Sequence, residues 1–163
     1  MGNDLGPRPP WEESREPILR SPPVVTSLIV VFLVVHVASQ FLSDAQYGYL
    51  INAFGLSPER FAYYGLGGGG TSMDAFVAWA SLVTFAFLHG DFVHLVFNSL
   101  WFLIFATAVA RRVGTARFLT LALLASLGAA VAHLAFHWGS PVPAVGASGA
   151  VSGLMGAAFR FIF

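Results

Sequence analysis

The sequence predicts an all-α membrane protein, a polytopic helical bundle with four membrane-crossing helices. Composition is the first reason: 56% of the 163 residues are hydrophobic and only 10% are charged, whereas about 25% are charged in an ordinary soluble domain. Distribution is the second reason, because the apolar residues gather into four runs, at residues 24–42, 92–110, 118–136 and 147–163. A helix needs about 20 apolar residues to cross a bilayer core, and each run comes close to that length.

Composition also excludes several classes of function. The formal net charge is zero, so nothing favours nucleic acid as a partner. The chain has no cysteine, which excludes disulfides, thiolate metal sites and a cysteine nucleophile. No pattern indicates a bound cofactor, and the expected surroundings are membrane lipid.

The chain begins with a polar segment, residues 1–22, in which proline, glutamate and arginine are mixed. It has neither the positive start nor the small-residue cleavage site of a secretory signal. We therefore predict a cytoplasmic tail followed by a transmembrane domain at residues 23–163. The first run contains His36. An ionisable residue inside a bilayer can carry protons, but the sequence favours a histidine that is hydrogen-bonded to a neighbouring helix.

A long loop at residues 43–91 connects the first run to the second. Residues 50–64 are half apolar and are interrupted by Pro58, Glu59 and Arg60, so an interfacial or re-entrant element is expected there rather than a spanning helix. Four glycines follow at residues 67–70. Because no Gly-Lys-Ser/Thr follows them, they predict a flexible linker and not a phosphate-binding loop.

The arginines predict the orientation of the helices. Three lie in the tail, three at residues 111–117, one in the 43–91 connection, and none between the third and fourth runs. Cytoplasmic loops carry the arginine excess, so the tail and the 111–117 loop are expected inside and the other two connections outside. The membrane is expected to be a plasma membrane, the inner membrane of a bacterium. His94 and Ser148 then both fall near the outer ends of their helices.

His94 and Asn98 lie four residues apart in the second run and therefore share one helix face. Polar groups in lipid are costly unless they find partners. If both side chains point at one position, their N–H groups can stabilise the oxyanion of an acyl-transfer intermediate. An interhelical hydrogen bond is the alternative, and the pair taken alone favours that alternative.

Ser148 lies between small residues at the start of the fourth run, in the stretch Val145-Gly-Ala-Ser-Gly-Ala-Val-Ser-Gly153. A helix that begins there leaves its first N–H groups free, and Gly146 and Gly149 allow close approach of the backbone. A serine nucleophile fits this position. Packing between helices is the commoner role of such a stretch, and Gly149-x-x-x-Gly153 is a pattern that favours close helix contact.

His133 and His137 form a second pair four residues apart at the end of the third run. No carboxylate or third ligand lies nearby in the sequence, and the glutamate of the His-Glu-x-x-His pattern of zinc proteases is missing. The sequence therefore predicts no metal site.

Three stretches together resemble the rhomboid family of intramembrane serine proteases. They are Thr84-Phe-Ala-Phe-Leu-His-Gly-Asp-Phe-Val-His-Leu-Val-Phe-Asn98, Arg112-Val-Gly-Thr-Ala-Arg-Phe-Leu119, and Val145-Gly-Ala-Ser-Gly-Ala-Val-Ser-Gly-Leu-Met-Gly156. The resemblance runs from about residue 17 to the last residue. The combined pattern is far more specific than any one of its parts.

The resemblance implies a role for each site residue. Ser148 is the implied nucleophile, and His94, Asn98 and the backbone N–H of Ser148 form the implied oxyanion hole. His89 matches a histidine that supports the loop entering the second helix. Gly146 and Gly149 shape the turn that carries the nucleophile. The implied substrates are single-spanning membrane proteins, cut near the outer bilayer surface at small residues, and the 43–91 connection matches the family's membrane-embedded first loop.

The chain departs from the family pattern at two places. The family has six helices, with the general-base histidine on the sixth, whereas this sequence ends in the fourth. None of the five histidines, His36, His89, His94, His133 and His137, takes the place of that base. A serine hydroxyl is a weak nucleophile without a base, so we expect this to be the N-terminal portion of a protease and to be inactive alone. Ala80 and Ser81 stand where the family often has arginine or glutamine.

Two other classes of function compete with the protease. One is a non-catalytic relative that binds or escorts membrane proteins, but such relatives usually lose the serine or the histidine–asparagine pair, and both are present here. The other is a channel or transporter, for which the sequence offers no charged intramembrane pathway. The protease interpretation also predicts that the gene continues past codon 163 into two more apolar runs, the second with a histidine near small residues.

Overall fold

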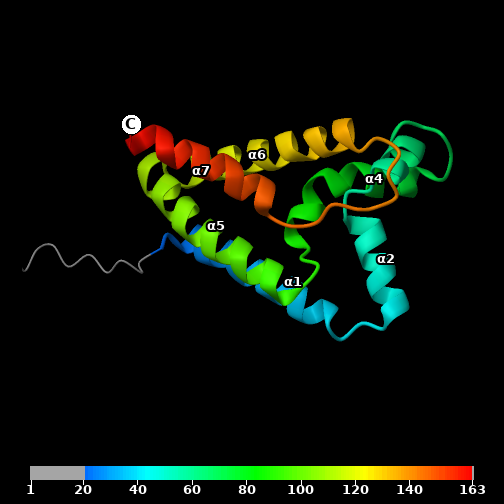
Figure 1. Cartoon of the computed structure of the whole chain (residues 1–163), viewed down its shortest axis with the longest axis horizontal. Coiled ribbons are helices and arrows are strands. Elements are labelled where there is room, and N and C mark those ends of the chain that lie inside the picture. Colours follow the sequence, from blue (N-terminus) through cyan, green and yellow to red (C-terminus); the bar gives the residue numbers. More distant parts are fainter. Residues whose placement is uncertain (1–20, 163) are drawn as a thin grey trace, which may run out of the picture.

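The computed structural model describes residues 21–162, and the part of the chain that it describes is helical, as predicted. The elements in order are α1 (Pro23–Ser39), α2 (Asp44–Phe54), α3 (Pro58–Arg60), the π-helical turn η1 (Phe61–Gly65), α4 (Ser72–Thr84), the 3-10 turn η2 (Phe85–Phe87), α5 (Phe92–Val113), α6 (Thr115–Phe136) and α7 (Ser148–Ile162). Figure 1 shows α1 alongside α5, with α2 and α4 gathered at one end of the bundle. The predicted tail lies almost wholly outside the described residues.

Within residues 21–162, two helices are long and apolar enough to cross a membrane, α5 and α6, with 22 residues each. They coincide with the second and third runs, and only Gly114 separates them, with φ at +81°. α1 and α7 are shorter, with 17 and 15 residues. α1 ends three residues before the predicted position because residues 40–42 form a tighter turn of i→i+3 hydrogen bonds. Ser43 then caps α2 with its side chain.

α7 packs against both α5 and α6, and small residues form its contact with α6. A methyl group added at Gly149 would overlap the side chain of Ala129, and one added at Gly153 would overlap that of Ala125. As the sequence predicts, the Gly149-x-x-x-Gly153 pattern brings the backbones of two helices together. The core that surrounds this contact contains the fully buried side chains of Phe102, Phe118 and Leu154.

The connection at residues 43–91 is helical over most of its length instead of forming a long irregular loop. Capping boxes start both of its longer helices, Ser43 with Gln46 before α2 and Thr71 with Asp74 before α4. Its apolar side chains form a second core against the last turns of α6, made by Leu56, Phe61, Ala78, Phe85, Ala86, Ala130 and Leu134. The connection is thus a folded unit that is packed onto the bundle.

The four glycines at residues 67–70 form a packed turn, which differs from the predicted flexible linker. The N–H of Gly68 donates to the carbonyl of Tyr63 at 2.7 Å. A side chain at Gly69 would overlap the Tyr63 ring, and Gly70 has φ at +82°. Glycine is needed here because the chain turns back directly over two tyrosine rings, and this packing cannot be seen in a run of glycines.

Candidate active site

Ser148 is the first residue of α7, at the point where the chain returns from the 137–147 loop. Its side chain is exposed, whereas its neighbours Ala147 and Ala150 are buried in the core. Its carbonyl accepts a hydrogen bond from the hydroxyl of Ser152 at 2.8 Å. The serine is therefore an exposed residue at a helix N-terminus.

The folded connection holds the segment that leads to Ser148. Leu56 and Ala144 exchange two backbone hydrogen bonds of 3.0 Å each. The N–H of Gly146 donates to the carbonyl of Phe85 at 2.9 Å. The nucleophile turn, which we define as residues 144–148, is therefore fixed by backbone bonds to the segments that follow α2 and α4. Sequence reasoning did not find these partners, because backbone groups leave no residue-type signal.

His94 and Asn98 lie in the first two turns of α5. Asp91 caps this helix, and its carboxylate accepts the N–H of His94 at 2.7 Å. The side-chain amide of Asn98 is buried and donates to the carbonyl of His94 at 3.0 Å. This bond uses one of the two N–H groups of the amide. The cap and the amide bond together fix the start of α5 and the two side chains that it carries.

Gly146 brings the two halves of the site together. A Cβ atom at Gly146 would lie 2.7 Å from both Cε1 and Nε2 of His94, and 3.6 Å from Nδ2 of Asn98. Its φ of +113° also lies in the region that side chains disfavour. The backbone two residues before Ser148 is therefore in direct contact with the His94 ring and close to the Asn98 amide. The sequence predicted that His94 and Asn98 act together with Ser148 and that Gly146 shapes the turn; the contact of Gly146 with the His94 ring is an addition from the structure.

Gly149 makes the close helix contact that the Gly149-x-x-x-Gly153 pattern predicts. It faces α6, where Ala129 and the backbone of Ser126 lie against it. It therefore acts on the serine by letting α7 approach α6 closely, and Gly146 is the glycine that contacts the polar side chains.

His89 lies behind His94 and is only 2% exposed. Its ring meets the His94 ring nearly edge-on, with ring centres 5.3 Å apart, and it also packs on Phe32 of α1 at 5.4 Å. Burial, and to a lesser degree the neighbouring His94, lowers the pKa of His89 from 6.5 to about 4. The ring is therefore neutral at pH 7, and it fills the space between α1 and the site.

His36 of α1 is also buried, and its Nδ1 lies 3.2 Å from the carbonyl oxygen of His89. The sequence favoured a bonded histidine over a proton carrier, and the structure gives it a bonding partner. That partner is a loop carbonyl and not a group on a neighbouring helix.

The pair His133 and His137 lies at the end of α6, with its rings stacked at 4.6 Å. Within residues 21–162, no group of three or more potential metal ligands is found.

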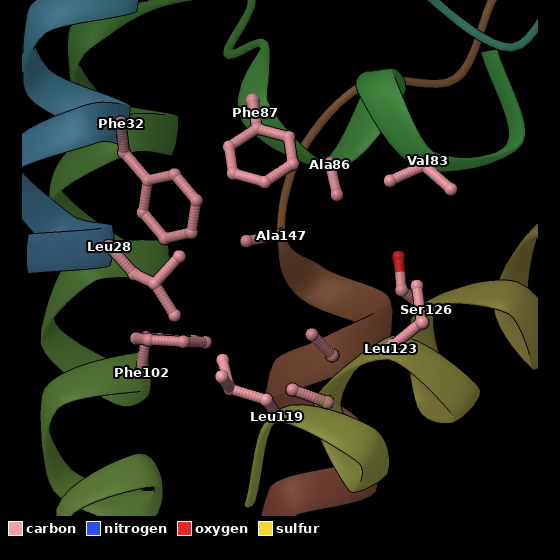
Figure 2. A pocket seen from close by; sticks show the side chains of 12 residues that line it. Leu28, Phe32, Val83, Ala86, Phe87, Phe102, Leu119, Leu123, Ser126 and Ala147 are labelled. Atoms are coloured by element: carbon pink, nitrogen blue, oxygen red, sulfur yellow. The ribbon is translucent and has the colours of Figure 1, made fainter. Parts of the chain in front are cut away.

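An apolar cavity of about 130 Å³ lies inside the bundle, between α1, α5, α6 and α7 and beside η2. Figure 2 shows Phe32, Phe87, Phe102 and Leu123 around it, with Ala147 reaching in from the nucleophile turn. Ser126 contributes the one hydroxyl among the residues that line it. Ser148 is not among the residues that line this cavity, although its neighbours Ala147 and Ala150 are.

These features define a helical integral membrane protein with a serine, a histidine and an asparagine gathered at one end of its bundle. Comparison with known proteins gives the family. The model of the Rhomboid domain matches residues 77–163, just over half of the chain. The chain belongs to the rhomboid family, which confirms the resemblance seen in the sequence.

Two relatives from Bacillus subtilis (strain 168) carry related names. The chain is 36% identical over 105 residues to "Rhomboid protease GluP", an alignment that covers 56% of this chain and 20% of that protein. It is 39% identical over 80 residues to "Putative rhomboid protease YdcA", with coverage of 48% and 39%. The chain therefore spans between a fifth and two fifths of the length of these relatives.

Proposed function

We propose that this chain supplies the nucleophile and the oxyanion-binding side chains of an intramembrane serine protease. The observation that carries the proposal is the contact of Gly146 with the His94 ring, close to the Asn98 amide and two residues before Ser148. It joins a potential nucleophile to two side-chain donors that are 50 and 54 residues distant in the sequence. The names of the two relatives, both of which contain "rhomboid protease", support the same class of reaction.

The proposed reaction assigns one step to each group. The Ser148 hydroxyl oxygen attacks the carbonyl carbon of the scissile peptide and gives its proton to a base. The negative charge that develops on the carbonyl oxygen is stabilised by N–H groups of His94, Asn98 and the Ser148 backbone. The C–N bond then breaks as the amine leaves with a proton, and water hydrolyses the acyl-enzyme to restore the serine.

The N-terminus of α7 favours the negative charge that develops on the substrate carbonyl oxygen. The first N–H groups of a helix have no partner within it, and the helix dipole places partial positive charge at this end. Ser148 Oγ and the developing oxyanion both lie at that end. We do not assign the general base to any of the five histidines, His36, His89, His94, His133 and His137.

We further propose that the site faces the outer side of a bacterial inner membrane and cuts single-spanning proteins there. The arginine distribution supports this orientation, because Arg111, Arg112 and Arg117 cluster at the opposite end of α5 and α6 from His94 and the 137–147 loop. The exposed side of Ser148 supports access for a second polypeptide.

The test uses the full-length gene product in lipid vesicles with a model transmembrane substrate. Ser148→Ala is expected to abolish cleavage, because no other group replaces the attacking oxygen. Thr120→Ala is the matched control, since it removes an exposed hydroxyl of α6 whose hydrogen bond, to the carbonyl of Ala116, stays within that helix; it is expected to keep most of the activity. Cleavage that survives Ser148→Ala would remove the serine assignment. Substrate binding without any cleavage by the unaltered protein would favour a non-catalytic relative instead.

A further inference from the structure

We propose that His36 of α1 is a positioning residue for His94, a role that rests on the proposed function. Its ring N–H holds the carbonyl of His89 and so fixes the loop of residues 88–91, from which α5 begins. His36 acts on the site through this loop.

The hydrogen bond to the His89 carbonyl determines which ring nitrogen of His36 carries the proton. Nδ1 of His36 lies 3.2 Å from the His89 carbonyl oxygen, and the two residues are 53 positions apart. A carbonyl oxygen only accepts, so this bond requires the proton of the ring to be on Nδ1. His36 is 5% exposed, and a buried carbonyl without a partner is costly. The bond therefore joins α1 to the 88–91 loop at a point where water cannot replace it.

The loop of residues 88–91 contacts His94 in two ways, and its position therefore affects that of His94. The His89 ring packs between Phe32 of α1 and the edge of the His94 ring, with ring centres 5.4 Å and 5.3 Å away. Asp91 accepts the backbone N–H of His94 at 2.7 Å. Both the ring and the backbone of His94 are thus in contact with residues of the loop whose carbonyl His36 holds.

The position of the His94 ring is sensitive because Gly146 leaves little room beside it. A Cβ at Gly146 would approach the ring to 2.7 Å, so the ring lies against the nucleophile turn itself. A displacement of about 1 Å in a catalytic group can cost about 100-fold in rate. A loop that is released from α1 therefore changes the rate of the chemical step more than it changes substrate binding.

The chain offers a conservative replacement and a matched control. In His36→Asn the side-chain nitrogen is attached to Cγ, as Nδ1 is in histidine, so an N–H can reach the same carbonyl. His36→Leu fills the space without a donor. Val34→Leu places the same side chain on α1 at a position that is 59% exposed, and it controls for the general effect of a leucine on this helix.

The experiment measures kcat and KM for a model transmembrane substrate with the full-length gene product in vesicles. His36→Leu is expected to lower kcat by about tenfold to 100-fold with KM nearly unchanged. His36→Asn is expected to restore kcat to within a few fold of the unaltered protein, and Val34→Leu to leave it unchanged. If His36→Leu does not fold, His36→Met replaces it as the variant without a donor.

A second measurement on residues 1–163 does not depend on activity. Amide hydrogen exchange at residues 88–94 is expected to become faster in His36→Leu, while exchange in α6 stays the same. The His36 role is overturned if Ser148→Ala is inactive and His36→Leu keeps full kcat and unchanged exchange at residues 88–94. It is also overturned if His36→Asn is as slow as His36→Leu. Activity that persists in Ser148→Ala would instead overturn the proposed function.

Discussion

At the residue scale, the site depends on the absence of a side chain at Gly146. The backbone there adopts φ of +113° and lies against the ring of His94. A larger residue meets both obstacles at once, because positive φ strains it and because its Cβ overlaps the ring. A single methyl group is therefore enough to separate the nucleophile turn from α5.

We predict that Gly146→Ala destabilises the fold by about 1–3 kcal/mol and abolishes most of the proteolytic activity of the full-length gene product. The measurement combines thermal unfolding in detergent with the cleavage assay. Gly156→Ala is the matched control, because nothing lies within 4 Å of a Cβ at Gly156. It is expected to be neutral or slightly stabilising in a helix. A Gly146→Ala protein with normal stability and activity would show that this contact is not needed.

The buried His89 makes the stability of the fold depend on pH. Its pKa is about 4 in the folded chain and 6.5 in the unfolded chain. As pH falls from about 6.5 to about 4, His89 binds a proton in the unfolded chain but not in the folded chain. The free energy of unfolding therefore falls across this window. His89→Gln is expected to flatten the dependence of the melting temperature on pH between 4 and 6.5. An unchanged slope in that variant would mean that other groups cause it.

At the scale of elements, the approach of α7 to α6 decides where Ser148 is held. Gly149 and Gly153 face Ala129 and Ala125 with no space for a side chain between them. Van der Waals packing is the main source of helix association in lipid, where no hydrophobic force drives helices together. Small residues are therefore the source of stability at this interface.

We predict that Gly153→Val destabilises the fold by about 1–3 kcal/mol because it overpacks this interface. Gly156→Val, on the open side of the same helix, controls for the helix propensity of valine. Unfolding in detergent measures both variants. Equal stability of the two variants would contradict the importance of the α6–α7 contact.

The 43–91 connection shows that an element can matter to the site without contributing a side chain to it. It pairs Leu56 with Ala144 and accepts the N–H of Gly146 at Phe85. Within the connection, the hydroxyl of Thr84 donates to the carbonyl of Phe54 at 2.7 Å and so joins the end of α4 to the end of α2. These bonds between distant segments fix the nucleophile turn from the side opposite to α5.

At the scale of the whole molecule, the arginines predict that the two ends of the bundle face different compartments. The absence of cysteine allows single cysteines to be introduced and labelled without background. Val142→Cys lies in the 137–147 loop, and Thr115→Cys lies at the start of α6; both positions are exposed.

We predict that a membrane-impermeant maleimide labels Val142→Cys in cells whose inner membrane is intact, and labels Thr115→Cys only after that membrane is permeabilised. The physical reason is the retention of arginine-rich loops in the cytoplasm. The reverse labelling pattern would show that the predicted orientation is inverted.

Much of the architecture could be predicted from the sequence, because it depends on local properties. The runs at residues 92–110 and 118–136 became α5 and α6 with small changes at their ends. The connection could not be predicted in the same way: its helices are short, half apolar and started by caps at Ser43 and Thr71, signals that are weak without their tertiary partners. The turn at residues 67–70 differs from the flexible linker that its glycines predict, because the tyrosine rings that order it lie outside the glycine run.

The sequence by itself determined that the chain is a membrane protein and predicted which residues carry its chemistry, since apolar length and polar residues in an apolar run are local features. Only the tertiary structure decided which of these residues meet. Gly146 contacts His94, and His36 holds the carbonyl of His89 across 53 positions. Such contacts depend on how whole helices pack and on backbone groups that every residue shares, and no local pattern of side chains specifies either.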